Sequence, residues 1–421
     1  MRICIFEDAK FDQLYPLTHL RPVWELRCGH TLLYEKILRQ FPDADCAFFA
    51  RDCLTDVLKE RHANAAINDM AALTGDVLLL VNGRWLFTDA KLEAAGSQEV
   101  GKAGDAIAYA RVDRATAEKC AADTFDAFLD NVANEQPAVE VEAKLIDYPW
   151  DIIVNLQDSI RNDFEHLPER GIKGEFDNLA RLYGNESDVY IAPGAAVEAG
   201  AVLDAREGPI IVDRETMIHP NSWIIGPVSI GEKTLVVGAK VREGCAIGPV
   251  CRVGGEIEEA VMHAYVNKWH DGFLGHGYVC EFVNLGAATQ NSDVKNDFGN
   301  VEVYCKGELV KTGQWKVGCF IGDHTKTSIG TLFNTGSHIG AMCIILGGDG
   351  VLPKFVPSFT WYINRRITKG FGLKALLAGA DAQMDKRDRH LTAADIELIK
   401  HVREITRPQL LERAKRDRKG M

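Results

Sequence analysis

From Val189 onward, apolar residues recur at every sixth position, and this repeat restricts the possible folds more than any other feature of the chain. A period of six fits neither an α-helix, with its 3.6 residues per turn, nor a strand, whose side chains alternate. It is typical of a parallel β-helix, in which three short strands form each triangular coil and one aliphatic residue per strand points inward. We therefore predict a left-handed parallel β-helix over residues 188–358. The predicted inward positions are Ile191, Val197, Leu203, Val212, Ile218, Ile224, Ile230, Leu235, Val241, Ile247, Val253, Phe273, Val279, Leu285, Ile321, Thr327, Phe333, Ile339, Ile345 and Val351.

Small residues support this prediction, because glycine often follows the aliphatic residue, as in Ile230-Gly231 and Ile247-Gly248. Glycine allows the tight corner that joins two strands of a coil. The alternative is a chance six-residue spacing in a glycine-rich antiparallel domain, but several separate blocks hold the period. Because such coils usually associate through their flat faces, we expect a homotrimer.

The first 170 residues alternate strand-like and helix-like segments, a pattern typical of a mostly parallel sheet with helices on its faces. We predict an α/β domain with a Rossmann-like sheet over residues 1–170, a linker over 171–187 and a helical tail over 359–421, with a capping signal at Leu391–Asp395. The expected strands are Arg2–Phe6, Asp45–Ala50 and Asp76–Val81, and the expected helices are Thr31–Phe41, Leu54–Glu60, residues 115–135 and Leu156–Phe164.

Composition excludes several classes of protein. The 421 residues suggest two domains, and 46% hydrophobic with 26% charged residues argue against disorder. A net charge of -12 disfavours nucleic-acid binding, which needs a basic surface. No apolar run approaches the roughly 18 to 20 residues of a membrane span, and the amino terminus becomes acidic too early for a signal peptide. The eleven dispersed cysteines are typical of reduced thiols, so we expect a cytoplasmic protein without membrane partners.

Polar residues gather within the repeat, from His270 to Lys295. Acyl transfer to an amine or hydroxyl needs a base that works near neutral pH, and histidine, with an ordinary pKa of about 6.5, meets this need. Asn284 and Lys295 could bind a phosphorylated sugar, and the backbone amides of Gly286–Ala288 could face a thioester oxygen. A single histidine is more often structural, but these neighbours favour a catalytic role for His270.

The string from His270 to Thr289 resembles the acetyltransferase strip of the bifunctional uridyltransferase/acetyltransferase family GlmU, which makes UDP-N-acetylglucosamine. The resemblance implies an acyl donor, acetyl-CoA, and a sugar-phosphate acceptor, with His270 as the catalytic base. The implied substrate-binding residues are Phe273, in place of a tyrosine, Asn284, Ala287, Asn291 and Lys295.

Two positions depart from the GlmU pattern. His276 has no counterpart there and is interpreted as a coil residue, unless the base has been reassigned. Glu258 falls near the place where the family supplies a basic residue from the preceding coil.

The segment Arg21–Gly29, which reads RPVWELRCG, resembles a divergent bacterial GlmU-like branch in which this motif replaces the usual glycine-rich loop. The resemblance implies that Arg21 neutralises charge in nucleotidyl transfer and that Arg27 and Lys36 bind phosphate. The alternative for each is ordinary surface or helix-packing charge.

Magnesium is expected as the cofactor of that reaction, because it bridges the phosphates of a nucleotide and is held by carboxylates. By resemblance Asp151 is the candidate ligand, with Asp8 as another. The usual aspartate after the third strand is missing, since Asn82-Gly83 leads to Arg84.

Together these features predict a transferase with two activities. The first would join a nucleoside triphosphate, such as UTP, to a sugar 1-phosphate, such as N-acetylglucosamine 1-phosphate. The second would acetylate glucosamine 1-phosphate from acetyl-CoA. Two alternatives remain open: a nucleotidyltransferase whose β-helix only oligomerises or regulates, and a non-enzymatic sensor of sugar nucleotides, favoured by Arg84 and the missing loop.

Overall fold

The computed structural model describes residues 1–74, 77–88, 91–347, 350–370 and 372–419, and the chain divides into two compact units. Unit 1 contains Met1–Asp12, Arg21–Leu26 and Thr31–Asp147. Unit 2 contains Gln13–Leu20, Arg27–His30 and Tyr148–Met421. The expected single boundary near residue 170 is therefore replaced by an interleaved division, because two short N-terminal segments and residues 148–170 belong to unit 2.

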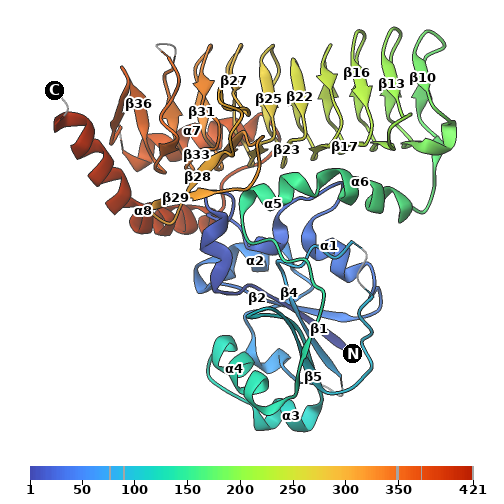
Figure 1. Ribbon diagram of the computed structural model, residues 1–421, viewed down its shortest axis with the longest axis vertical. Helices are drawn as coiled ribbons and strands as arrows, with labels where there is room; N and C mark the ends of the chain where they lie inside the picture. The colour runs from blue at the N-terminus through green and yellow to red at the C-terminus, as the bar shows by residue number, and fades with distance from the viewer. Residues whose placement is uncertain (75–76, 89–90, 348–349, 371, 420–421) are drawn as a thin grey trace. The chain divides into compact units, whose positions relative to one another are not determined.

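Unit 1 is built on a seven-stranded mixed sheet with the order β3-β2-β1-β4-β6-β5-β7 (Figure 1). β1 to β4 run parallel, whereas β6 runs antiparallel to β4 and to β5. This confirms the predicted Rossmann-like, mostly parallel core. The strands are β1 (Arg2–Phe6), β2 (Asp45–Phe49), β3 (Ala66–Ile67), β4 (Leu78–Asn82), β5 (Glu99–Ala103), β6 (Ala106–Val112) and β7 (Ala138–Glu140).

The helices of unit 1 are α1 (Leu33–Leu38), α2 (Thr55–Arg61), α3 (Arg114–Lys119) and α4 (Phe125–Glu135). The helix predicted over residues 115–135 is two helices, because Asp113 and Thr124 each accept a hydrogen bond from the first turn that follows and so begin separate helices. The strand predicted from Asp76 begins at Leu78, and residue 76 lies outside the described residues.

The direction of the chain changes beside β1. From β1 the chain proceeds outward through β2 and β3, and it then returns to the other side of β1 for β4. In open α/β sheets, ligands bind at such a switch point, outside the carboxyl ends of the strands. The residues after β1, β2 and β4 are therefore the candidates for a ligand-binding site in unit 1.

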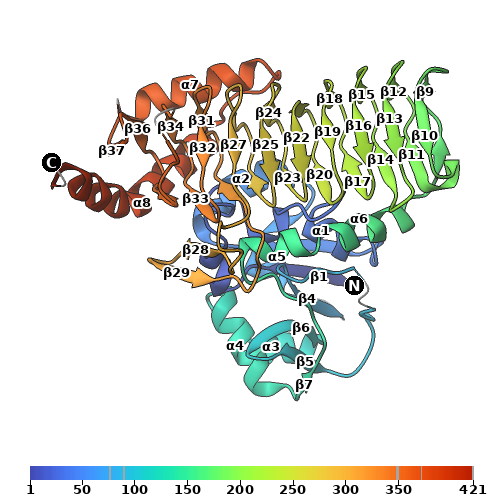
Figure 2. The same ribbon diagram turned by 45° about the horizontal axis from the view of Figure 1, so that its top comes forward.

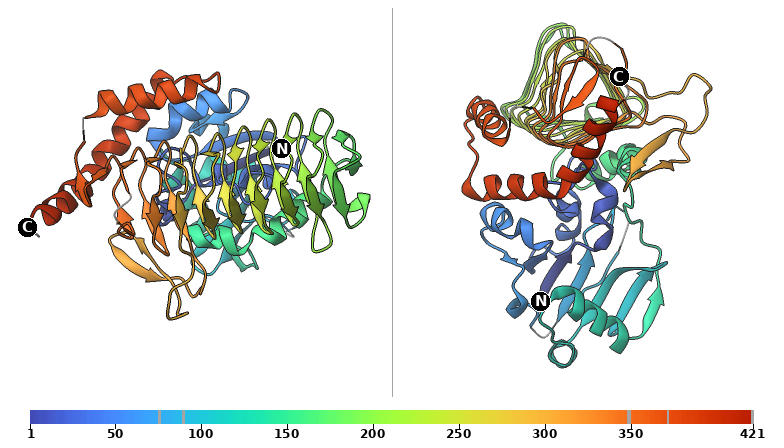
Figure 3. Two further views of the ribbon diagram at one scale, coloured as in Figure 1. Left: turned by 90° about the horizontal axis from the view of Figure 1, so that it is seen from above. Right: turned by 90° about the vertical axis from the view of Figure 1, so that its left-hand side faces the viewer.

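Unit 2 is a parallel β-helix, which confirms the predicted repeat fold. Seen along its axis, the coil has a triangular outline (Figure 3, right). Face A contains β8 (Gly171–Ile172), β11 (Val189–Ile191), β14 (Ile210–Val212), β17 (Val228–Ile230), β20 (Cys245–Ile247), β23 (Val261–Met262), β26 (Tyr278–Val279), β30 (Cys319–Ile321), β33 (Ser337–Ile339) and β35 (Phe355–Val356).

The other two faces follow face A in each coil (Figure 2). Face B contains β9 (Glu175–Phe176), β12 (Ala196–Val197), β15 (Met217–Ile218), β18 (Leu235–Val236), β21 (Arg252–Val253), β24 (Asn267–Lys268), β31 (Lys326–Thr327), β34 (Ile344–Ile345), β36 (Trp361–Ile363) and β37 (Arg366–Thr368). Face C contains β10 (Arg181–Tyr183), β13 (Val202–Asp204), β16 (Trp223–Ile225), β19 (Lys240–Val241), β22 (Glu256–Glu258) and β25 (Phe273–Gly275), followed by β27 (Gln290–Asn291) and β32 (Leu332–Phe333).

Most of the predicted inward residues are buried, but three are not. Leu235 and Phe273 are partly exposed, because their neighbours Val236 and Leu274 take the inward positions, and Val351 is 56% exposed. Where a corner of the coil has a different length, the inward position moves by one residue from the one that a spacing of six predicts. The repeat therefore predicts the coil correctly and misplaces single residues next to irregular corners.

Three segments extend the coil. Residues 292–318 leave the coil and carry an antiparallel hairpin of β28 (Glu302–Cys305) and β29 (Glu308–Lys311) (Figure 2). Helices α5 (Pro149–Val154) and α6 (Leu156–Glu165) precede the coil, and α7 (Leu373–Asp385) and α8 (Ala393–Lys419) form the tail. The expected linker over 171–187 carries β8, β9 and β10 of the first coil, and the last coil extends past residue 359 to β36.

No helix among the described residues combines the length and the apolar character needed to cross a membrane.

The stability of the coil is predicted to depend on its inward residues. Replacing Ile257, which is fully buried in β22, with alanine should lower the free energy of unfolding by about 2 to 5 kcal/mol, because it leaves a cavity. The matched change Ile329→Ala, at a side chain that is 72% exposed, should change it by less than about 0.5 kcal/mol. Urea denaturation of both variants measures the difference, and equal losses would contradict an inward role for Ile257.

Candidate functional site

His270 lies at the corner between β24 on face B and β25 on face C, called here the B–C corner. Its side chain is exposed and forms no hydrogen bond or ion pair with the residues that the structure describes. The next coil stacks in register above it, since the Ala288 amide donates to the Asp271 carbonyl at 2.8 Å. One step back on face B, the side-chain amide of Asn267 donates to Asn284 Oδ1 at 2.6 Å. The structure thus brings His270, Asn284 and the Ala287–Ala288 turn together on adjoining coils.

The three backbone amides of Gly286, Ala287 and Ala288 differ in availability. The Gly286 amide donates to Thr327 Oγ1 at 3.0 Å, and the Ala288 amide is used by the Asp271 carbonyl. Within the described parts of the chain, the Ala287 amide has no hydrogen-bond partner. The expected group of three open amides is therefore reduced to one, next to the corner that carries His270.

Lys268 supports this corner from inside the coil, a feature that the sequence reasoning missed. It pairs in register with Val253, so its side chain takes a position that aliphatic residues hold in earlier coils, and it is 2% exposed. Its Nζ donates to the carbonyls of Gly254 at 2.7 Å, Gly272 at 2.6 Å and His270 at 3.4 Å. Burial lowers the pKa of Lys268 to about 8. A lysine in the inward register was the available sequence signal.

Glu258 stands where the resemblance implies a basic residue. Two cations contact its carboxylate. Arg242 Nη1 lies 2.6 Å from Glu258 Oε2, and Lys316 Nζ lies 3.1 Å from Oε1. Phe273 lies on the same face, one coil above Glu256, and its ring lies against Gly275, where an added Cβ would be 2.3 Å from Cζ. Face C therefore has basic side chains, but they come from other coils than His270 and are paired with Glu258, where β22 ends and not where face C begins at the B–C corner.

His276 lies between two carboxylates and is 4% exposed. Its Nδ1 lies 2.8 Å from Asp293 Oδ2, and its Nε2 lies 3.0 Å from Glu259 Oε2. Burial lowers the pKa of His276, but the hydrogen bonds with Asp293 and Glu259 outweigh burial and raise it to about 9. A protonated histidine with both nitrogens engaged is a structural cation, which supports its interpretation as a coil residue.

Asn291 and Lys295 are placed differently from the expectation for substrate-binding residues. The Asn291 side chain accepts from the Gly275 amide and donates to the Gly275 carbonyl, both at 2.9 Å, so it continues the ladder of face C. Lys295 Nζ pairs with Asp297 at 3.1 Å in the segment that leaves the coil. Their substrate-binding roles stay predictions.

In unit 1, a cleft of about 640 Å³ opens at the carboxyl ends of β1 and β2. Arg51, which follows β2, lies 3.0 Å from Glu7 Oε2 through its Nε, and its guanidinium lies over the Phe11 ring at 4.2 Å. Arg51 is the one cation among the residues that line this cleft, as far as the structure describes them. The lining carboxylates are Glu7, Asp8, Asp52, Asp123, Asp126 and Asp130.

At the switch point beside β1, Arg84 forms a two-pronged ion pair with Asp8. Arg84 is fully buried, and its Nε and Nη2 donate to the two Asp8 carboxylate oxygens at 2.8 and 2.6 Å. Asn82 adds a hydrogen bond to Asp8 at 2.9 Å, and Asp147 also pairs with Arg84. Burial raises the pKa of Asp8, but the hydrogen bonds and charge of Arg84 outweigh it and hold that pKa below its ordinary value.

These contacts do not fit the expected magnesium ion. Both oxygens of Asp8 are engaged by cationic or amide donors, and Asp151 caps α5 by accepting from the Tyr148 amide at 2.8 Å. No group of three or more His, Cys, Asp or Glu side chains is placed to hold a metal in the described part of the chain. Magnesium binding by Asp151 therefore stays a prediction, and no chemical step is derived through it.

The RPVWELRCG segment divides between the units. Arg21 belongs to unit 1, is 2% exposed and is not among the described residues that line the cleft. Arg27 belongs to unit 2, where its amide donates to the Tyr278 hydroxyl at 2.9 Å and its Nε to the His263 carbonyl at 3.2 Å. Lys36 is buried, and its Nζ donates to Thr31 Oγ1 at 3.1 Å. Phosphate binding by these three residues stays a prediction.

Comparison with known proteins places these sites in context. Residues 3–171 match the family model described as sugar nucleotidyl transferase. A bifunctional sugar-1-phosphate nucleotidylyltransferase/acetyltransferase of Sulfurisphaera tokodaii is 27% identical over 153 residues, which cover 34% of this chain and 36% of that protein. The chain thus matches only about a third of the length of this relative.

Two further relatives come from Escherichia coli. An uncharacterized acetyltransferase named YaiX, from strain 536, is 26% identical over 198 residues, which cover 46% of this chain and 83% of that protein. The K12 protein, a putative uncharacterized acetyltransferase of the same name, is 25% identical with the same coverage. Together with the family model, these matches support a transferase.

The His276 cluster predicts a pH dependence of stability. The pKa of this group is raised from 6.5 to about 9 in the folded state, so its stabilising contribution is complete below pH 6.5 and is lost as the pH rises through 9. The free energy of unfolding should fall by about 2 kcal/mol between pH 6.5 and about pH 8. Above that pH, Lys268 titrates with the opposite sign.

Urea denaturation across this pH range measures how the free energy of unfolding changes with pH. This dependence should be much weaker in His276→Gln. The control His390→Gln, at a side chain that is 65% exposed, should show the same dependence as the wild type. A wild-type slope in His276→Gln would show that the cluster does not hold the extra proton.

Proposed function

We propose that this chain is a bifunctional transferase of sugar-nucleotide synthesis, with acetyl transfer at the B–C corner of unit 2 and nucleotidyl transfer in unit 1. The observation that carries the first assignment is the exposed His270 imidazole on the coil next to the open Ala287 amide. A general base and an amide donor on adjoining coils are the two groups that acyl transfer from a thioester to an amine requires.

In the proposed acetyl transfer, the amine of glucosamine 1-phosphate attacks the carbonyl carbon of acetyl-CoA. His270 takes the proton that the amine loses, and the Ala287 amide donates to the oxyanion that develops on the thioester oxygen. Collapse of this intermediate breaks the carbon–sulfur bond, and the CoA thiolate leaves and takes up a proton. By the resemblance, Asn284 would bind the sugar phosphate. Lys268 is a positioning residue, because it acts on the backbone of the corner.

In the proposed nucleotidyl transfer, a phosphate oxygen of a sugar 1-phosphate attacks the α-phosphorus of a nucleoside triphosphate, and pyrophosphate leaves. UTP and N-acetylglucosamine 1-phosphate are the proposed substrates. The family-model match over residues 3–171 supports this assignment, and Arg51 is the cation that the cleft offers to a phosphate.

We also propose that the chain works as a homotrimer through its coil faces.

The charge of the unit 1 cleft favours a second candidate function. Six carboxylates against one arginine oppose the binding of a free triphosphate. The alternative is an acetyltransferase whose unit 1 binds a sugar nucleotide without turning it over. Pyrophosphate release separates the two candidates, since the alternative gives none with any substrate pair.

Replacing His270 with alanine should reduce acetyl transfer at least about 100-fold, because the base is lost, and should leave nucleotidyl transfer unchanged. Thiol release from acetyl-CoA with glucosamine 1-phosphate measures the first activity. His219→Ala, at another histidine of the coil, serves as the control and should retain both activities. Unchanged acetylation in His270→Ala would remove His270 as the base.

A panel of nucleoside triphosphates and sugar 1-phosphates should release pyrophosphate fastest with UTP and N-acetylglucosamine 1-phosphate. Arg51→Ala should lower this rate at least about tenfold, and Arg51→Lys should lower it less, because it keeps the charge. Arg114→Ala, at an exposed arginine of α3, is the matched control. Equal rates in Arg51→Ala and the wild type would exclude the unit 1 cleft as the phosphate site.

A further inference from the structure

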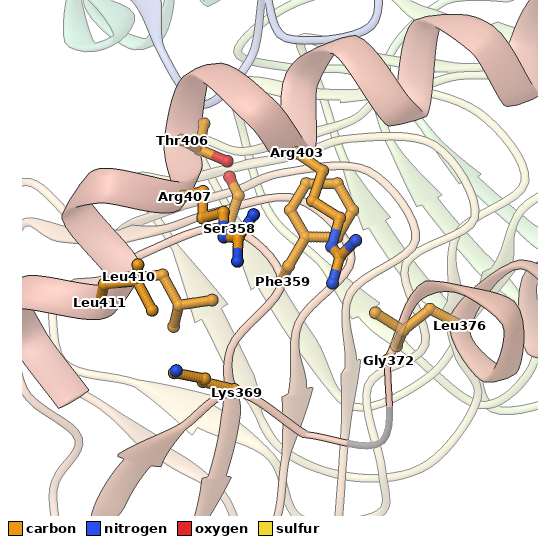
Figure 4. A pocket seen from close by; sticks show the side chains of 10 residues that line it. All are labelled: Ser358, Phe359, Lys369, Gly372, Leu376, Arg403, Thr406, Arg407, Leu410 and Leu411. Carbon is orange, nitrogen blue, oxygen red and sulfur yellow. The ribbon is translucent and has the colours of Figure 1, made fainter.

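A small pocket of about 60 Å³ lies between the last coil and the helical tail of unit 2, and we call it the tail pocket. Its floor is the turn of Ser358 and Phe359, which joins β35 on face A to β36 on face B (Figure 4). Arg403 and Arg407 extend from α8 toward this turn, and Lys369, just after β37, lies on the opposite side (Figure 4). Three cations from two separate segments therefore meet around one small space.

None of these three cations is neutralised within the described residues. Lys369, Arg403 and Arg407 form no ion pair or side-chain hydrogen bond there, and no carboxylate lines the tail pocket. Some other basic side chains of the tail have acidic partners, such as Lys400 with Glu397 at 2.6 Å. Because like charges at close range repel each other, a counter-ion would stabilise this arrangement.

The lining also offers a neutral donor. Ser358 is 3% exposed, and its Oγ accepts from the Ala341 amide at 3.0 Å. Its hydroxyl proton has no acceptor in the described part of the chain, so it can be donated into the pocket. The Thr406 hydroxyl, in contrast, already donates to the Val402 carbonyl at 2.7 Å. Ser358 and the three cations can thus donate into the pocket, which is the chemistry of an anion site.

Size and charge select the anion. A space of about 60 Å³ has room for one phosphoryl group. Guanidinium groups match phosphate oxygens with paired donors, and a phosphate monoester carries about 1.5 to 2 negative charges near neutral pH. Two arginines and one lysine carry enough positive charge to neutralise it.

We propose that the tail pocket binds a phosphate dianion, either free or as the terminal group of a phosphate monoester. This site is separate from the two activities proposed above and does not depend on them. The bound anion would connect α8 to the last coil, because its partners come from both. Occupancy should therefore raise the thermal stability of the protein.

The test is the binding of inorganic phosphate to the full chain. Calorimetry measures the affinity, and the melting temperature measures the gain in stability. Ionic strength is kept constant with chloride, which screens charge without matching the donor pattern. Phosphate should raise the melting temperature of the wild type, and Arg403→Gln/Arg407→Gln should weaken this binding at least about tenfold. Lys400→Gln/Lys415→Gln removes two exposed charges of the same helix outside the pocket and should bind phosphate as the wild type does.

The outcomes distinguish the source of the phosphate. If glycerol phosphate binds with similar affinity and competes, the site takes monoesters; if only inorganic phosphate binds, it takes the free anion. Equal binding by the wild type and Arg403→Gln/Arg407→Gln, or no response to phosphate beyond that to chloride, would overturn the proposal. If circular dichroism shows that this double variant is unfolded, the exposed Lys369→Gln replaces it and should weaken binding about threefold.

Discussion

The inward side chains of unit 2 and the parallel register between its coils determine where the faces and corners of the coil lie. Each strand pairs with the equivalent strand of the next coil, so a corner in one coil lies above the corresponding corner of the one before. This stacking is what places Ala287 near His270, although sequence spacing alone suggests no contact. Lys268 is a charged residue in an interior that is otherwise mostly apolar. A buried ammonium is costly unless it is hydrogen-bonded, and its carbonyl partners belong to the corner that it stabilises.

Paired charges organise both units. In unit 1, Arg84 occupies the place where a metal-binding aspartate is expected and is held by Asp8. In unit 2, His276 acts as a fixed cation between two carboxylates. Arg84 and His276 thus have structural roles that their positions in the sequence do not reveal. His270 and the cations of the tail pocket differ from these two, since they face solvent or a cavity.

The sequence predicts the architecture well, because periodicity depends on which side chains are buried. The six-residue repeat locates the coils, and the three strands predicted in unit 1, which became β1, β2 and β4, are found to within two residues, whereas β3, β5, β6 and β7 are not predicted. The sequence does not predict the interleaved units, because contacts such as the hydrogen bond from Arg27 to the His263 carbonyl join residues that are far apart in the chain. It also cannot distinguish a metal ligand from a helix cap at Asp151, because both roles require an acidic residue at the same place.

The central claim is that the B–C corner is the site of acyl transfer. A crystal structure of the protein with bound acetyl-CoA tests this claim most directly. We expect the thioester oxygen within about 3 Å of the Ala287 nitrogen, with the His270 imidazole facing the side from which an amine would approach. A donor bound at another face of the coil, with the Ala287 amide still open, would contradict the account.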